Sequence, residues 1–184
     1  MRYDAAHKSR TRARILEAAM ASLVREGPAA VTVHGVMRAA GLSHGGFYAH
    51  FESQAALLAA ALEGAAARTL EGLFGAAATE MPVDARALIG RYLGRAHLEA
   101  SGGCPLPASC GGHLDGPAED ARRDAVAQYR NAFNAIAPDA SKADALLALM
   151  VGGVAVARAR GGDEGEAVLR ACRLAARDLL SVAT

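Results

Sequence analysis

The sequence predicts an all-α protein, and three observations support this fold class. Ala is abundant, and it has the highest intrinsic helix propensity of all residues. Apolar residues recur every three or four positions along most of the chain, which is the period of an amphipathic helix. Hydrophobic residues make up 52% of the 184 residues and charged residues 21%, a balance that favours a globular chain over a disordered one.

The first third of the chain predicts four helices with clear start and stop signals. Thr32, Ser43 and Ser53 each precede an apolar-periodic run, where a hydroxyl can cap the helix N-terminus. Gly27-Pro28 ends the first helix, and Gly41 ends the second. The expected helices cover residues 11–27, 33–40 and 44–51, and a fourth begins after residue 53.

The rest of the chain predicts four more helices around one irregular segment. We expect a helix at 83–100, an irregular Gly- and Pro-rich region at 101–117, and helices at 118–137, 141–160 and 163–182, with Ser141 as a cap. Tyr92, Tyr129 and Phe133 fall on apolar stripes and are expected in the core, although they can also line a ligand cavity.

The net charge of +1 hides an asymmetry along the chain. Residues 1–60 carry seven Lys or Arg and four acidic residues, whereas the remainder has a net charge of −2. Five of the basic residues lie between Arg2 and Arg14, as expected for a segment that faces a phosphate backbone. A solvated basic tail would show the same charge pattern.

Neither a membrane span nor a disulfide framework is expected. The longest strongly apolar stretch without charge, Ala145–Ala157, is too short to cross a bilayer. Three cysteines at irregular spacing suit a reducing compartment, so we expect a cytoplasmic protein without membrane contact.

Residues 31–51, VTVHGVMRAAGLSHGGFYAHF, predict a helix-turn-helix, because two short helices flank a Gly-containing turn. In this motif the N-terminal end of the second helix approaches base edges in the major groove of DNA. That end is small and polar here, with Ser43, His44 and Gly45. Ser43 and the helix N-terminus can hold a phosphate.

The same stretch resembles the TetR/AcrR family of transcription regulators. The family pattern is Thr, a short helix, Ala-Gly-(Val/Leu)-Ser, a variable pair, then Gly-x-(Phe/Leu)-Tyr-x-His-Phe. This chain has Thr32, then Ala40-Gly41-Leu42-Ser43, and a tail of Gly45, Gly46, Phe47, Tyr48, Ala49, His50 and Phe51. The likeness covers about residues 10–60. It implies a helix-turn-helix DNA-binding domain at 1–52 and an all-helical ligand-sensing and dimerisation domain at 53–184.

The resemblance also implies roles for individual residues. Thr32 and Tyr48 would contact phosphates, and His50 would support a backbone contact or cap the helix. His34, His44 and Gly45 would lie near bases, while Phe47 and Phe51 belong to the small core. Two positions depart from the pattern: Gln54 replaces a frequent phosphate-binding Lys, and Gly35 lies inside a helix, where it costs about 1 kcal/mol relative to Ala.

Cys104 and Cys110 are candidate redox sensors. Glycines precede Cys104 and prolines follow it, which suggests an exposed thiol near a helix start, where the thiolate is favoured. Some TetR-like regulators are similar in this segment, and a few of those sense oxidants or electrophiles. Cys110 lies close enough to resolve an oxidised Cys104 as a disulfide. An inert, half-buried Cys104 is the alternative, and zinc binding with His113 is disfavoured because no fourth ligand is near.

No catalytic constellation stands out, so we expect neither an enzyme nor a bound metal or cofactor. The small residues Gly152, Gly153, Ala155, Ala157 and Ala159 favour a homodimer through the last two helices. The sequence therefore predicts a repressor that binds double-stranded operator DNA and is released by a small molecule, oxidant or electrophile. The rival hypothesis is a helical ligand-binding module without DNA activity.

Overall fold

The computed structural model describes residues 2–75, 84–99 and 103–181, and every regular element in these ranges is a helix. The all-α prediction is confirmed. The elements, in chain order, are α1 (Arg2–Glu26), the 3₁₀ helix η1 (Pro28–Ala30), α2 (Val33–Ala39), the 3₁₀ helix η2 (His44–Ala49), α3 (Gln54–Phe74), α4 (Ala85–Tyr92), α5 (Arg95–Glu99), α6 (Leu106–Ser109), α7 (Gly116–Asn134), α8 (Ala140–Arg160) and α9 (Gly162–Leu180).

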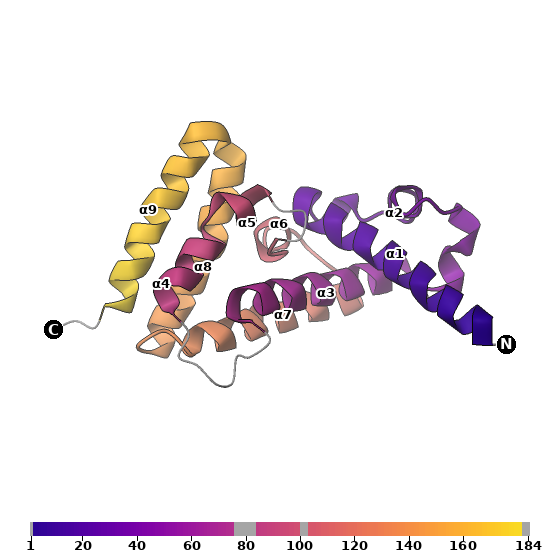
Figure 1. Ribbon diagram of the computed structural model, residues 1–184, viewed down its shortest axis with the longest axis horizontal. Coiled ribbons are helices and arrows are strands. Elements are labelled where there is room, and N and C mark those ends of the chain that lie inside the picture. Colours follow the sequence, from indigo (N-terminus) through magenta and orange to yellow (C-terminus); the bar gives the residue numbers. More distant parts are fainter. Residues whose placement is uncertain (1, 76–83, 100–102, 182–184) are drawn as a thin grey trace.

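The helices form an elongated molecule with three parts (Figure 1). Helices α1 and α2 lie at one end, and the antiparallel pair α8 and α9 lies at the other. Helices α3 and α7 pack side by side along the middle and join the two ends. A movement in one end can therefore reach the other through two packed helices.

Two of the predicted helix caps are present, and two expected caps are wrong. Thr32 Oγ1 accepts a hydrogen bond from the Gly35 amide at 3.1 Å, and Ser53 Oγ accepts one from the Ala56 amide at 3.0 Å. Ser43 precedes η2 but makes no capping bond. Helix α8 is capped by Asp139, whose carboxylate accepts from the Lys142 amide at 2.8 Å, rather than by Ser141.

Several helix bounds differ from those that the sequence predicts. Helix α1 begins at Arg2, so the basic N-terminal segment is helical rather than a free arm. The third predicted helix is a 3₁₀ helix, since the pair Gly45-Gly46 weakens α-helix formation. The expected helix at 83–100 is interrupted at Gly94, where a Cβ would lie 2.8 Å from the Gly90 carbonyl oxygen. The irregular segment contains the one-turn α6.

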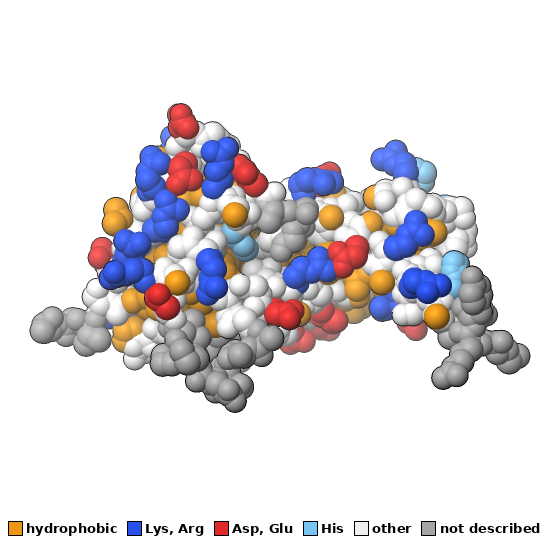
Figure 2. Space-filling model, viewed as in Figure 1, with side chains coloured by type: hydrophobic (Ala, Val, Ile, Leu, Met, Phe, Trp, Pro, Cys, Tyr) orange, Lys and Arg blue, Asp and Glu red, His pale blue; other side chains and the backbone are white. Residues whose placement is uncertain are grey.

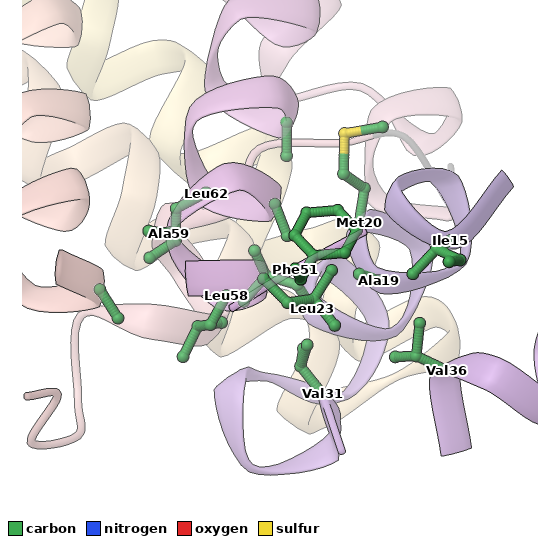
Figure 3. Close-up of a cluster of buried hydrophobic side chains, with 14 of the residues drawn as sticks. Ile15, Ala19, Met20, Leu23, Val31, Val36, Phe51, Leu58, Ala59 and Leu62 are labelled. Carbon is green, nitrogen blue, oxygen red and sulfur yellow. The ribbon is translucent and has the colours of Figure 1, made fainter. Parts of the chain in front are cut away.

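Two hydrophobic cores follow one another along α3. The first core joins α1, α2, η2 and the first half of α3, and Figure 3 shows side chains such as Leu23, Phe51 and Leu62 meeting there. The second core, from Ala66 onward, joins the end of α3 to α4, α7, α8 and α9. The first core thus extends into α3, past residue 52, and the domain boundary at residues 52 and 53 stays a prediction.

Arginine side chains fasten several helix ends to neighbouring elements. Arg14 donates to the Ala40 carbonyl at 2.6 Å, Arg91 to Leu73 at 2.6 Å, and Arg158 to Val24 at 3.0 Å. The last carbonyls of a helix have no intrahelical partner and carry partial negative charge, so a cation is a favourable partner there. Arg158 connects the two parts of the molecule, because it joins α8 to the end of α1.

Helix α8 is long and apolar enough, by composition alone, to cross a membrane. In the structure it packs on α7 and α9, with Leu146, Met150 and Val154 fully buried. Much of its apolar surface remains uncovered within this chain. A core or interface helix of a globular protein has this character.

Candidate nucleic-acid interface and sensor core

The helix-turn-helix is built from α2 and η2 around a short turn. Gly41 takes a φ of +67° there, a conformation that residues with a Cβ adopt at a cost. The Leu42 amide closes the turn by donating to the Met37 carbonyl at 2.9 Å. Val36 and Phe47 are fully buried and anchor the two helices to α1 and α3, so the motif has a fixed shape.

The residues predicted to face DNA are exposed on this motif. Thr32, His34, Ser43, His44 and Gly45 are all exposed, and the rings of His34 and His44 lie 6.5 Å apart. The structure therefore brings the exposed imidazoles of α2 and η2 together. These polar side chains lie on the outside of helices that the core holds in place. Their contacts with DNA remain a prediction.

Tyr48 is an exposed large hydrophobic side chain in the helix-turn-helix. It is 70% exposed and packs edge-on against the buried Phe47, with ring centroids 5.2 Å apart. Folding gains little from an aromatic ring that stays in water. The phenol hydroxyl is instead available to donate to a partner such as a phosphate oxygen.

Two glycines in the motif, Gly35 and Gly45, differ in what a Cβ at their position would meet. A Cβ at Gly35 would lie 2.9 Å from Thr32 Oγ1, so Gly35 leaves room for the capping hydroxyl. A Cβ at Gly45 would meet nothing within 4 Å. Packing within the chain therefore does not require Gly45, and this leaves its backbone open to close approach by DNA.

A groove of about 380 Å³ runs between the N-terminal half of α1 and the end of η2. It is lined by His7, Lys8, Thr11, Arg14, Leu42, Ala49 and His50. His50 Nδ1 is buried and has no hydrogen-bond partner among the described residues. The imidazole is half-buried at this groove, where a phosphate could accept from it; no capping bond by its side chain is seen.

The basic residues of α1 divide into supporting and free groups. Lys8, Arg10, Arg12 and Arg14 are all exposed. Arg14 donates to the Ala40 carbonyl and the Arg12 guanidinium lies 4.6 Å above the Phe51 ring, whereas Lys8 and Arg10 form no ion pair or side-chain hydrogen bond with the described residues. Figure 2 shows basic and His side chains over this end of the molecule, with acidic groups mostly elsewhere on that face. Sequence reasoning missed His7 and Thr11, although their spacing with Arg14 follows one face of a helix.

The interior of the second core contains polar groups. Tyr92, Cys104 and Tyr129 are fully buried, and neither phenol hydroxyl has a hydrogen-bond partner of regular geometry among the described residues. The Tyr92 ring stacks on the His97 ring at 4.5 Å, and His97 Nε2 accepts from the Cys104 amide at 3.3 Å. An unpartnered buried hydroxyl costs about 1–3 kcal/mol, so the two phenols are candidates for a role beyond packing.

The expectation of an exposed, acidic thiol at Cys104 is wrong. The side chain is fully buried, and burial raises the pKa of the thiol above its ordinary value. Cys104 also lies before α6 begins rather than within its first turn. Local sequence suggested exposure, but packing of α4, α6 and α7 around the residue encloses it.

Cys110 is the exposed cysteine, and Cys104, Cys110 and Cys172 are all free thiols. Partial desolvation by its neighbours nevertheless raises the pKa of the Cys110 thiol. Cys172 is half-buried on α9. Within the described parts of the chain, no group of three or more His, Cys, Asp or Glu residues is placed to hold a metal ion.

Comparisons with known proteins agree with this geometry. Residues 15–61 match the family model for bacterial regulatory proteins of the tetR family, while a search of curated protein sequences finds no match. The fold is similar to that of reduced NemR from Escherichia coli, at 17% identity and a TM-score of 0.71, covering 95% of this chain and 98% of that one.

Two further solved structures are similar. A TetR-family regulator from Cytophaga hutchinsonii has 20% identity and a TM-score of 0.72, covering 95% of this chain and 94% of that one. Another from Pectobacterium atrosepticum has 26% identity and a TM-score of 0.56, with the same coverage. Residues 15–61 therefore carry the helix-turn-helix of tetR-family regulatory proteins, and the described chain has the fold of TetR-family transcriptional regulators.

Proposed function

We propose that the protein is a cytoplasmic homodimeric repressor that binds a pseudo-palindromic operator and is released by a small molecule or an oxidant. The observation that carries the proposal is the exposed polar surface of the helix-turn-helix, with Tyr48 and the adjacent His34 and His44. Tyr48 and Thr32 would hold phosphates, and His34, His44 and Gly45 would approach base edges. Ser43 and His50 would make further backbone contacts.

The experiment is a fluorescence anisotropy titration with DNA fragments selected by the full-length protein. Log affinity is expected to fall steeply with log salt concentration, because Lys and Arg displace counterions from phosphates. Tyr48→Ala should weaken binding to all sequences alike, whereas His44→Ala should change base preference. Tyr48→Phe is the matched control, since it keeps the ring and removes only the hydroxyl.

The rival hypothesis, a helical ligand-binding module, predicts no salt-dependent binding to DNA. A salt-insensitive affinity for the selected fragments would reject the repressor. If Tyr48→Ala and Tyr48→Phe both bind as the wild type does, the helix-turn-helix surface is not the reading surface.

The proposed dimer interface is the uncovered face of α8 and α9. Along α8 a run of small and apolar positions is exposed or half-buried, and on α9 Leu174 is 63% exposed. The α8 positions are Ala145, Ala148, Gly152, Ala155, Val156 and Ala159. An uncovered run of small and apolar residues of this kind suits a four-helix contact between two copies.

Gly153 does not belong to that face, although the sequence suggested it. A Cβ there would lie 2.8 Å from the Cys172 sulfur of the same chain, so Gly153 serves the contact between α8 and α9. Ala157 is likewise fully buried inside the chain. Gly152 meets nothing within 4 Å and is the better probe.

Gly152→Arg should therefore give monomers, because it places an unpaired charge in the contact. Ala67→Arg, on an exposed position of α3, adds the same side chain elsewhere and should leave the dimer intact. Sedimentation velocity at micromolar concentration measures both masses. A dimer that survives Gly152→Arg, while wild type and control are also dimers, would move the interface to another surface.

A further inference from the structure

The buried polar groups of the second core form a cluster of hydrogen-bond donors. Tyr92 of α4 and Tyr129 of α7 each bring a phenol hydroxyl to the Cys104 side chain, and all three residues are fully buried. Neither hydroxyl finds a regular partner in the described parts of the chain. Two phenol O–H groups beside a thiol, which is a weak acceptor, favour a stronger acceptor, and most of all an anionic one.

Arg158 supplies positive charge next to this cluster. Its guanidinium is half-buried and close enough to influence the titration of Tyr92 and His97. Among the described residues it forms no ion pair with a carboxylate. Its guanidinium donates to the Val24 carbonyl at 3.0 Å. Arg158 therefore lies where the second core meets the end of α1.

Once a negative charge lies beside Cys104, Arg158 has two possible partners, this charge and the Val24 carbonyl, and it binds them with unequal strength. A guanidinium binds an anion more strongly than it binds a neutral carbonyl, and this difference grows where water is excluded. A buried anion in turn requires donors and a counterion, and Tyr92, Tyr129 and Arg158 can provide both. A charge beside Cys104 would therefore compete with Val24 for the arginine.

We propose that Tyr92, Tyr129 and Arg158 form a site for one negative charge beside Cys104, and that this charge draws Arg158 from the Val24 carbonyl. The loss of this tie frees the end of α1 and lowers operator affinity. The inference rests on the proposed function for its link to DNA. Its first step, the movement of Arg158, does not depend on DNA.

Two sources can supply the charge. One is a small carboxylate that enters the cluster as a ligand. The other is Cys104 itself, when a peroxide that reaches the core oxidises its buried thiol: the O–O bond breaks, sulfur takes one oxygen, and the other oxygen leaves as water. The resulting sulfenic acid loses a proton to give a sulfenate. In this case sulfur is oxidised by two electrons and the peroxide is reduced.

The test compares C104D, which places a carboxylate in the cluster, with C104N, which has the same shape without the charge. C104D is expected to bind selected operator DNA about ten-fold more weakly than C104N, within the usual range of allosteric coupling. The comparison uses full-length proteins whose helix content and thermal unfolding show that they are folded. Equal affinities of the two variants would overturn the proposal.

Arg158 is tested by its own pair of variants. In R158M, which keeps bulk but lacks charge, C104D and C104N should bind DNA equally, whereas R158K should retain part of the difference. This non-additivity is the signature of a coupled pair. A ten-fold difference that persists in R158M would show that Arg158 does not carry the effect. Should C104D not fold, peroxide acting on R158M and R158K gives the same comparison, and an equal response would overturn the proposal.

Amide hydrogen exchange separates this inference from the repressor hypothesis. C104D should exchange faster than C104N at residues 23–27, including the Gly27 amide that donates to Leu23 at 2.9 Å. If the wild type binds no DNA, the proposed function fails while this readout still decides the inference. If the wild type binds DNA and exchange is equal in both variants, only the inference fails.

The two sources give different results with acetate and hydrogen peroxide as probes. Release by acetate that persists in C104S indicates a bound anion. Release by peroxide that is absent in C104S and reversed by dithiothreitol indicates oxidised Cys104. Either result supports the site only if R158M abolishes it, and release that is unchanged in R158M rejects it.

Discussion

The two hydrophobic cores of this protein differ in what they contain. The core of the DNA-binding end is built from aliphatic side chains and two phenylalanines, Phe47 and Phe51. The second core, around α7 and α8, is also built mainly from buried apolar residues, but it encloses Tyr92, Tyr129 and Cys104 as well. One core is uniformly apolar, and the other holds polar atoms that lack partners.

The two parts of the molecule therefore differ in where their candidate functional side chains lie. At the DNA-binding end the candidate functional groups, such as Tyr48 and His44, lie on the surface, so the core beneath them can be packed for stability alone. In the second core the candidate functional groups are internal. Buried polar groups without regular partners commonly mark functional sites. They reduce the stability of the protein, and packing elsewhere in the fold offsets this loss.

The largest expected effect tests the apolar core. Phe47→Ala should lower the free energy of unfolding by about 3–5 kcal/mol, because it removes a fully buried ring and leaves a cavity. Tyr48→Ala is the matched control, one residue away and 70% exposed, and should cost at most about 0.5 kcal/mol. Urea denaturation followed by circular dichroism measures both. Similar losses for the two variants would contradict the division between support and surface.

The same difference explains what could be predicted from the sequence. In the DNA-binding end the relevant chemistry is local: Thr32 caps α2, Gly41 makes the turn, and Phe47 falls on the apolar side. Each depends on neighbours within a few residues, so the pattern predicts the structure. The start of α1 at Arg2 and the 3₁₀ form of η2 were missed, since helix ends and Gly-rich turns are weakly determined by pattern.

The second core could not be predicted in this way. Cys104 follows Gly-Gly and precedes Pro, which locally favours an exposed loop, yet contacts from segments distant in the sequence bury it. Gly153 is similar, because its neighbour Cys172 is contributed by the next helix. The tie between Arg158 and Val24 spans 134 positions and leaves no signal in a single sequence.

The second prediction concerns pH, through His97 at the edge of the polar cluster. Burial, together with the nearby charge of Arg158, lowers the pKa of His97 to about 4. The unfolded chain, with an ordinary histidine pKa of about 6.5, then binds a proton that the folded chain does not. Stability should therefore fall as the pH drops from about 6.5 towards 4, by about 1–3 kcal/mol, and change no further through this group below pH 4.

Urea denaturation at a series of pH values measures this slope, and His97→Gln should remove it. Carboxylates held by arginines, such as Glu17 beside Arg68, have pKa values below their ordinary range. They contribute stability that is lost as the pH falls below about 4.5, at the acidic end of this window, and this loss occurs equally in both proteins. A slope between pH 6.5 and 4 that is unchanged in His97→Gln would place the responsible group elsewhere.

The smallest expected effect compares partnered and unpartnered hydroxyls in the second core. Tyr92→Phe and Tyr129→Phe each remove a buried hydroxyl without a regular partner, so the free energy of unfolding should stay the same or rise by about 1 kcal/mol. Thr69→Val is the matched control. Its hydroxyl donates to the Ala65 carbonyl at 2.9 Å in the same core, and its loss should cost about 0.5–1.5 kcal/mol.

If the phenols of the second core serve recognition, removing their hydroxyls and removing the Thr69 hydroxyl should not lower the free energy of unfolding alike. A hydroxyl kept for folding should destabilise the protein when it is removed, as for Thr69, whereas one kept for recognition should not. The phenylalanine variants should then lose response rather than stability: the difference in operator affinity between C104D and C104N should shrink when Tyr92 or Tyr129 is replaced, since the charge loses a donor. If both Tyr→Phe variants instead unfold about as easily as Thr69→Val, the phenols serve the fold, and the two cores differ in composition but not in purpose.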